Sequence, residues 1–264
     1  MEWWLGYLGI GAAVGFFAGL LGIGGGAIMV PLLVMLFDAQ GLPPEHMLHV
    51  AVGTAMATVL FNSISSARAH ASLGSIRADL ALRITPGIIA GGLVGSWLTT
   101  YLPRGVFAAL FTAVIYIAAT NILLGRQPKA TREPPGAAGM FLVGFVISGV
   151  STLGALGGAF ITVPFLMYCN VPMLQAIGTA AAVGFPIGLA GTVGFVATGW
   201  NAAGVPSPSL GYVYLPALAG ILIASVLTAP LGARLAHALP TRRLKQIFAL
   251  VMYLVATRML ISLL

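Results

Sequence analysis

Long apolar runs separated by short polar stretches cover nearly the whole chain. Eight such runs stand out, at residues 3–37, 48–67, 84–102, 105–124, 137–169, 173–199, 210–235 and 241–264. A helix needs about 20 mostly apolar residues to cross a bilayer. The first and fifth runs are too long for one helix, and glycines interrupt both. The pattern therefore predicts a helical membrane protein with eight segments, two of which are broken.

The two halves of the chain repeat each other. The stretch GIGGGAIMVPLL at 22–33 aligns with LGGAFITVPFL at 156–166, and AVGTAMAT at 51–58 aligns with AIGTAAAV at 176–183. VIYIAATNILL at 114–124 also resembles VMYLVATRMLI at 251–261. Order and spacing agree, so the sequence predicts a duplicated four-segment unit. We expect a first repeat over 1–124, a polar and proline-rich linker over 125–136, and a second repeat over 137–264.

Composition supports the membrane interpretation. The chain is 59% hydrophobic and only 6% charged, whereas a soluble domain carries about 25% charged residues. The net charge of +7 is then a signal of membrane topology and not of nucleic-acid binding. The opening MEWWLGYLGIG lacks a basic leading region and a clear cleavage site, so we expect no cleaved signal peptide.

Basic residues cluster around three connections, at 68–83, 125–136 and 236–245. If every segment crossed once, the basic residues would divide almost evenly between the two sides. If segments one and five are hairpins that enter and leave on the same side, ten basic loop residues share one side against Arg104 alone. The positive-inside rule favours this second arrangement and makes these three connections cytoplasmic. It predicts external termini and two inverted repeats, each with one re-entrant hairpin and three full transmembrane helices.

The glycine-rich breaks are the leading candidates for a substrate site. Irregular backbone at mid-membrane is tolerated only where it lines a cavity or is buried in protein. Glycine lets backbone N–H groups approach a ligand, and a helix that begins after the break points its positive end at the site, which suits an anion. The alternative is that the glycines only permit close helix packing. The candidates at the two breaks are Gly24, Gly25, Gly26, Ser151, Thr152, Gly157 and Gly158.

The motifs GFFAGLLGIGGGAIMVPLL and VGTAMATVLFNSISSA, repeated as GFVISGVSTLGALGGAFITVPFL and IGTAAAVGF, resemble the TauE/SafE family of sulfite exporters. The resemblance extends over almost the whole chain. It implies transport of a small sulfur-containing anion across the bacterial inner membrane, namely sulfite, sulfoacetate, thiosulfate or a related sulfonate. It does not identify which of these anions is carried.

Neutral polar side chains in segments two and six extend the candidate site. Thr54 and Thr179 hold equivalent positions early in the two segments, and Asn62 and Ser63 lie deeper in segment two. We expect these four to bind substrate together with the breaks. The alternative for each is helix packing or a hydrogen bond back to the preceding turn.

Two further residues are candidates for titration or gating. His49 begins segment two, and its alternative role is that of an interfacial histidine. Pro186 lies inside segment six, where a proline bends or breaks a helix. All five acidic residues fall in or near loops or segment ends, so we expect no metal site and no cofactor. Moving one negative charge outward is favoured by about 2.3 kcal/mol per 100 mV, so uniport is the working hypothesis.

Together these features predict an inner-membrane secondary transporter that exports a small sulfur-containing anion. The alternatives are an importer or channel for such anions and a non-transport subunit of a membrane complex. No Ser-His-Asp set, HExxH motif or metal-ligand cluster is visible in the sequence, so no enzymatic activity is expected. The expected partners are the anion and membrane lipid, without nucleic acid.

Overall fold

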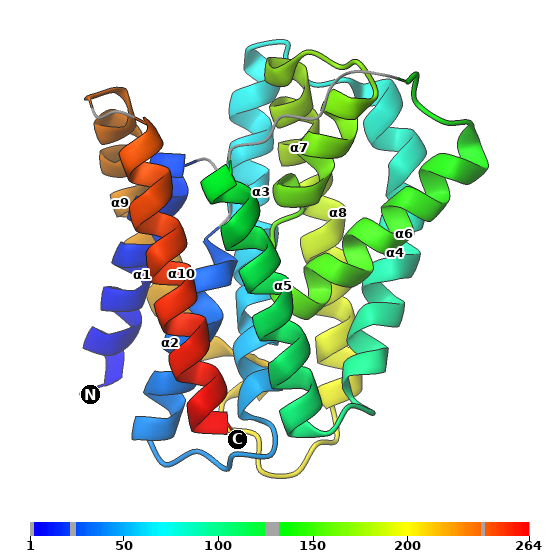
Figure 1. The fold of residues 1–264 in the computed structure, drawn as a ribbon. Helices are drawn as coiled ribbons and strands as arrows, with labels where there is room; N and C mark the ends of the chain where they lie inside the picture. The colour runs from blue at the N-terminus through cyan, green and yellow to red at the C-terminus, as the bar shows by residue number, and fades with distance from the viewer. Residues whose placement is uncertain (1–2, 22–24, 125–131, 239–240, 264) are drawn as a thin grey trace.

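The structure is a computed structural model that describes residues 3–21, 25–124, 132–238 and 241–263. This part of the chain forms ten α-helices and one two-stranded ribbon (Figure 1). The helices are α1 (Trp3–Leu21), α2 (Gly26–Ala39), α3 (Met47–Ser72), α4 (Ala78–Thr99), α5 (Arg104–Leu124), α6 (Ala137–Gly154), α7 (Ala159–Tyr168), α8 (Met173–Gly199), α9 (Leu215–Ala238) and α10 (Thr241–Leu263). The strands are β1 (Ser209–Leu210) and β2 (Val213–Tyr214).

The first and fifth apolar segments are each broken into two helices, as the sequence predicts. Segment one becomes α1 and α2, and segment five becomes α6 and α7. In Figure 1, α1 begins and α2 ends at the lower end of the bundle, whereas α6 begins and α7 ends toward the upper end. The two pairs of helices therefore enter the bundle from opposite ends.

Close helix pairs hold the bundle together. α1 packs along α9, α4 packs along α6, and α3 crosses α8 at the centre. Glycines make these contacts close: a Cβ atom added to Gly87 or Gly91 of α4 would lie 2.0 or 2.1 Å, respectively, from a backbone oxygen of α6. Small residues at such interfaces let helix backbones approach, which is a main source of helix association in lipid.

The ribbon of β1 and β2 is an element that the sequence pattern does not predict. Its two strands pair antiparallel between Ser209 and Tyr214 and between Leu210 and Val213. Gly211, with φ +54°, allows the tight turn between them. The turn brings the Tyr212 N–H to the Phe195 carbonyl at 3.1 Å, so the ribbon is anchored to the end of α8. Two residues per strand are too few to show a clear alternating pattern in the sequence.

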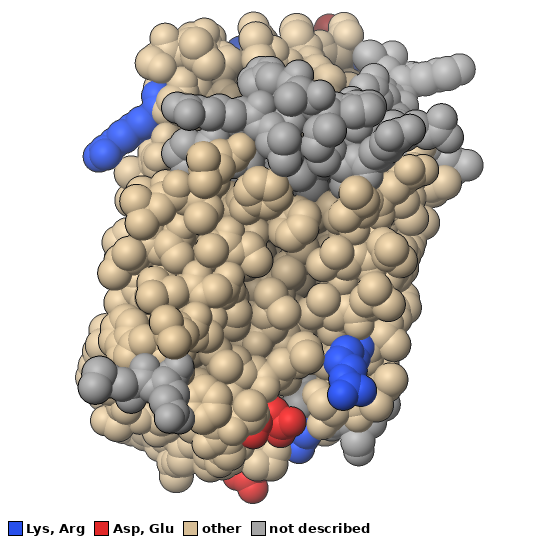
Figure 2. Space-filling model, turned by 90° about the vertical axis from the view of Figure 1, so that its left-hand side faces the viewer, with Lys and Arg blue, Asp and Glu red and all other residues tan. Residues whose placement is uncertain are grey.

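Five helices of the described part are long and apolar enough to cross a membrane: α3, α4, α5, α6 and α8. Six full crossings were expected, and the difference has two sources. α6 qualifies by length although it is one arm of a broken segment, and for α9 and α10 only the stretches Leu215–Ala229 and Gln246–Ser262 are described with their side chains and can be compared. Figure 2 shows one face with a broad middle band that carries no charged side chain among the described residues. The chain is a multi-pass membrane protein.

Candidate substrate site at the helix breaks

The two helix breaks touch each other. A Cβ atom added to Gly26, the first residue of α2, would lie 2.0 Å from the backbone oxygen of Ala155. Ala155 is the residue after α6 and has a left-handed backbone with φ 48°. No side chain fits between these two backbones, so glycine is required at position 26 for the contact. Gly24 lies outside the described residues.

The second break is a defined turn. Leu156 N–H donates to the Ser151 carbonyl at 2.9 Å, and Gly158 N–H donates to the Leu156 carbonyl at 2.7 Å. Gly158 has φ +75°, which glycine adopts without strain. α7 then starts with Gly158 as its N-cap and without a side-chain cap. α2 likewise starts from Gly25 without a side-chain cap, so two uncapped positive helix ends flank the contact.

Two buried hydroxyl groups flank the second break without a hydrogen-bond partner in the described part of the chain. They are Ser151 Oγ on the last turn of α6 and Thr162 Oγ1 on the first turn of α7. A buried hydroxyl without a partner costs free energy, so a ligand that accepted hydrogen bonds from both would offset this cost. Thr152 differs, because its Oγ1 donates to the Ser148 carbonyl at 2.8 Å.

Thr162 is a candidate that the sequence analysis missed. The aligned motifs offer a signal for it, since GAIMVP in the first repeat carries Met29 where AFITVP in the second carries Thr162. Such a replacement of an apolar residue by a hydroxyl within a matched motif marks a position where the two repeats differ in chemistry.

The second break packs against α8 beside α3. A Cβ atom on Gly184 of α8 would lie 3.2 Å from Ser63 Cβ and 3.4 Å from the Gly157 oxygen. A Cβ atom on Gly158 would lie 2.2 Å from Ile187 Cδ1. The predicted residues Ser63, Gly157 and Gly158 are therefore brought together around one stretch of α8.

The polar residues of α3 beside this part of α8 differ in their surroundings. Ser63 Oγ donates to the Leu60 carbonyl of its own helix at 2.8 Å. Asn62 is half-buried beside it on α3. α8 continues without interruption through Pro186, which lies two positions after Gly184. Pro186 therefore does not break α8 in this conformation.

Thr54 and Thr179 have equivalent main-chain partners. Thr54 Oγ1 accepts a hydrogen bond from the Tyr214 N–H at 3.0 Å, directly before α9. Thr179 Oγ1 accepts one from the Arg77 N–H at 2.9 Å, directly before α4. At 1.5 Å per residue, Thr54 is about 14 Å along α3 from Ser63. The structure thus uses both threonines to anchor the start of the following helix.

His49 lies at the start of α3, far along this helix from Ser63. Its side chain is buried, and Nε2 lies 3.0 Å from the Thr99 carbonyl oxygen. Its ring packs between Phe107 and Tyr212. Because His49 is on the first turn of α3, it is about 21 Å along the helix from Ser63.

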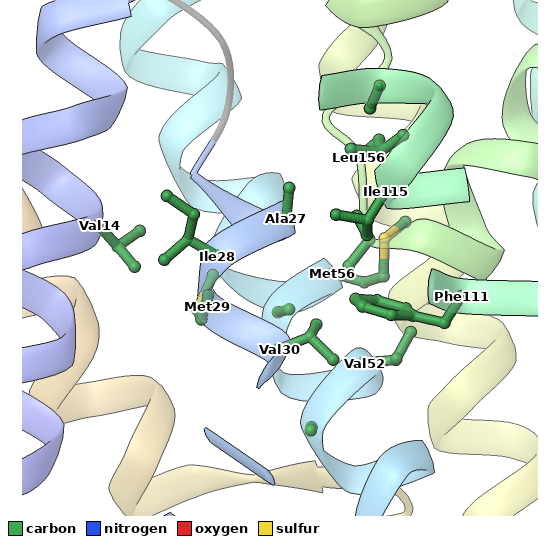
Figure 3. Close-up of a cluster of buried hydrophobic side chains, with 14 of the residues drawn as sticks. Val14, Ala27, Ile28, Met29, Val30, Val52, Met56, Phe111, Ile115 and Leu156 are labelled. Atoms are coloured by element: carbon green, nitrogen blue, oxygen red, sulfur yellow. The ribbon is translucent and has the colours of Figure 1, made fainter. Parts of the chain in front are cut away.

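Apolar side chains fill the centre of the bundle around the contact. Figure 3 shows them projecting from α1, α2, α3 and α5 and from the second break, and they are fully or almost fully buried. The labelled residues are Val14, Ala27, Ile28, Met29, Val30, Val52, Met56, Phe111, Ile115 and Leu156. Two recesses lie beyond this core, one of about 210 Å³ between α5, α6 and α7, and one of about 270 Å³ between the ends of α2 and α10. The breaks are closed against each other in this conformation.

Comparison with known proteins gives one family and several relatives. The profile of the family described as sulfite exporter TauE/SafE matches residues 7–259. A "probable membrane transporter protein" of Haemophilus influenzae is 34% identical over 96% of both chains. The "probable membrane transporter protein YdhB" of Bacillus subtilis is 23% identical over 88% of this chain and 90% of its own length. No solved structure gave a significant match. These names agree with the prediction of a membrane transporter and not of an enzyme.

Proposed function

The chain belongs to the sulfite exporter TauE/SafE family of membrane proteins, and on that premise we propose that it exports a small sulfur-containing anion through the contact between its two helix breaks. The substrate class is sulfite, thiosulfate, sulfoacetate or a related sulfonate. The observation that carries the proposal is the contact of Gly26 with the Ala155 carbonyl, where two broken segments meet inside a membrane-spanning bundle.

The proposal includes two repeats of opposite orientation, and reciprocal hydrogen bonds support it. Tyr116 Oη pairs with Thr257 Oγ1, and Thr120 Oγ1 pairs with Tyr253 Oη. In the aligned stretches 114–124 and 251–261, Tyr116 corresponds to Tyr253 and Thr120 corresponds to Thr257. Exchanging the repeats therefore converts one hydrogen bond into the other, as expected for a pseudo-two-fold axis between α5 and α10.

The equivalent threonines support the same axis. Thr54 accepts a hydrogen bond from the N–H before α9. If the hairpin of α6 and α7 counts as the first segment of the second repeat, α9 is its third segment. Thr179 binds the N–H before α4, the matching helix of the first repeat. Each repeat thus anchors the other across the central pair α3 and α8. This exchange of anchors is the arrangement that duplication with inversion produces.

The proposed orientation in the inner membrane follows from charge. Arg68, Arg77 and Arg83 surround the turn between α3 and α4, at the upper end in Figure 1. The N–H of Arg132, at the end of the linker, approaches the Tyr168 carbonyl at 3.4 Å, which places that part of the linker beside the end of α7. This end is cytoplasmic by the positive-inside rule, and both termini are then external.

The mechanism that fits these features is alternating access. The uncapped starts of α2 and α7 offer backbone N–H groups and positive helix ends to an anion. Ser151 and Thr162 add two buried hydroxyl donors. Separation of the two breaks from one side and then the other would expose these groups in turn. An inside-negative potential favours export of one negative charge by about 2.3 kcal/mol per 100 mV, so uniport suffices.

The test is uptake of labelled sulfite, thiosulfate and sulfoacetate into proteoliposomes of the full-length protein with an imposed potential. Potential-driven uptake of at least one anion, absent from protein-free liposomes, is the expected result. Gly158→Ala should abolish it, because Gly158 has φ +75° and faces Ile187 Cδ1. The matched control is Gly149→Ala on α6, where the added Cβ meets only the Gly91 oxygen at 3.7 Å. Folded protein that carries none of the three anions would overturn the proposed substrate class.

A further inference from the structure

Two basic residues depart from the charge pattern of the molecule. Of the 12 Lys and Arg residues, ten lie in or beside the three connections assigned to the cytoplasmic end. Arg104, at the start of α5, and Arg258, five residues before the end of α10, lie at the opposite end (Figure 1). Because basic residues are disfavoured on the external side, their presence there calls for a local reason.

Both arginines adjoin one recess. The recess of about 270 Å³ is lined by Met35, Asp38, Arg258, Ile261 and Ser262. Arg104 reaches the same place, because its Nη2 donates to the Ser262 carbonyl at 3.2 Å. Figure 2 shows acidic and basic side chains close together at the lower end of the molecule, below the uncharged band.

Among the described residues, neither Arg104 nor Arg258 forms an ion pair. Within the ranges that the structure describes, the one ion pair within 4.0 Å is that of Arg77 with Asp79, which lies elsewhere. Arg258 and Asp38 therefore line the same recess without forming an ion pair. Arg104 Nε is buried and has no hydrogen-bond partner among the described residues. Arg104 and Arg258 each carry five N–H donors, and Asp38 is a carboxylate that lines the recess with Arg258.

The recess lies at the opposite end of α2 from the contact between the breaks. α2 begins at Gly26, at the contact with the second break, and ends beside Asp38. α10 packs along α2. The 14 residues of α2 span about 21 Å, so one helix connects the contact with the recess.

The recess beside the hairpin of the second repeat is chemically different. Arg258 aligns with Asn121 of α5, and Asn121 lines the recess between α5, α6 and α7. The other lining residues of that recess are apolar: Val114, Ile117, Val150, Leu156, Phe160, Ile161 and Pro164. Of these two recesses, the one between α2 and α10 is therefore the one lined by charged side chains, those of Asp38 and Arg258.

We propose that Arg258 and Arg104 form an oxyanion-binding site in the recess between the ends of α2 and α10. The ligand class is a small oxyanion, either sulfite, thiosulfate or the sulfonate group of an organic anion, with sulfate as an unreactive analogue. The planar guanidinium group of Arg258 suits two oxygens of such an anion at once. The role of this site as the last binding step before release depends on the proposed export function, whereas anion binding itself does not.

The test measures anion occupancy at Ser262 without transport. In a Cys169→Ala background, Ser262→Cys places one thiol in the recess and keeps the backbone carbonyl that Arg104 binds. A negatively charged methanethiosulfonate reagent should modify this thiol faster than a positively charged one. Sulfate at twice its Kd should slow the modification about threefold, because only the unoccupied fraction reacts.

Two variants and a control make the test decisive. Adding Arg258→Gln should remove both the preference for the anionic reagent and the protection by sulfate, and Arg258→Lys should retain the preference with weaker protection. Arg68→Gln, at the opposite end of the bundle, should change neither. Protection that persists in Arg258→Gln, or that never appears in the parent, would overturn the site.

The same assay separates a lipid phosphate from a soluble oxyanion. The labelling rate is compared in detergent, in nanodiscs of phosphatidylcholine and in nanodiscs of phosphatidylglycerol. Protection by sulfate in detergent supports the proposal. Protection that appears only with phosphatidylglycerol would mean that a lipid headgroup occupies the recess, which contradicts the proposal. Because labelling requires no flux, failure of the export function would show only in the proteoliposome assay.

Discussion

Gly26 of α2 lies directly against the backbone oxygen of Ala155, the residue at which α6 ends. The contact joins the two halves of the chain at the point where each has a broken helix. It is also a contact between backbones, with no room for even a methyl group. At this position the smallest possible substitution should therefore have a large effect.

Gly26→Ala should separate the two breaks. The added Cβ would lie 2.0 Å from the Ala155 oxygen, so the backbones must move apart, and overpacking of this kind costs about 1–3 kcal/mol. We expect a lower thermal unfolding temperature in detergent and loss of potential-driven uptake. Gly9→Ala on α1 is the control, since nothing lies within 4 Å of its added Cβ. Equal behaviour of the two variants would show that the breaks do not touch.

Thr54→Val and Thr179→Val should both reduce stability. Each substitution leaves a backbone N–H, that of Tyr214 or Arg77, without its acceptor, at a cost of about 1–3 kcal/mol for a buried group. Anion affinity should stay unchanged. Thr192→Val on α8 is the matched control, because Thr192 Oγ1 donates only within its own helix, to Gly188. If the variants kept their stability and lost anion binding, the two threonines would instead be ligands of the anion.

The reciprocal hydrogen bonds between α5 and α10 predict equal couplings. Double-mutant cycles would combine Tyr116→Phe with Thr257→Val, and Tyr253→Phe with Thr120→Val. Hydrogen bonds between membrane helices contribute about 0.6 kcal/mol on average, and we expect similar values of the same sign in both cycles. The readout is the free energy of unfolding. Coupling in one cycle alone would argue against the proposed pseudo-two-fold axis.

The breaks could be predicted from the sequence because their cause is local. An apolar run too long for one helix, with glycines in its middle, must turn or break where protein can bury the irregular backbone, and the structure places α1/α2 and α6/α7 there. The equivalence of Thr54 and Thr179 was also visible. Their actual partners were not, because these are main-chain groups more than 100 residues away.

Other features depend on packing that the sequence does not display. Ser63 and Gly157 meet only because Gly184 on a third element lies between them. The short ribbon at Ser209–Tyr214 forms where a turn reaches the end of α8. Ser151 and Thr152 are adjacent residues that both carry a hydroxyl group. The Thr152 hydroxyl donates a hydrogen bond within its own helix, whereas the Ser151 hydroxyl has no partner among the described residues.

Binding of the anion at the contact between the two breaks can be tested through the hydroxyls of Ser151 and Thr162. The measurement is potential-driven uptake of the transported anion into proteoliposomes of the Ser151→Ala/Thr162→Val double variant. Both hydroxyls are buried without a partner in the described part of the chain, so their removal should leave the unfolding temperature unchanged or raise it. We predict that uptake falls at least about tenfold, because two hydrogen bonds to a charged ligand are lost. Uptake equal to that of the unmodified protein, from a double variant that is equally stable, would show that the anion does not bind at this contact.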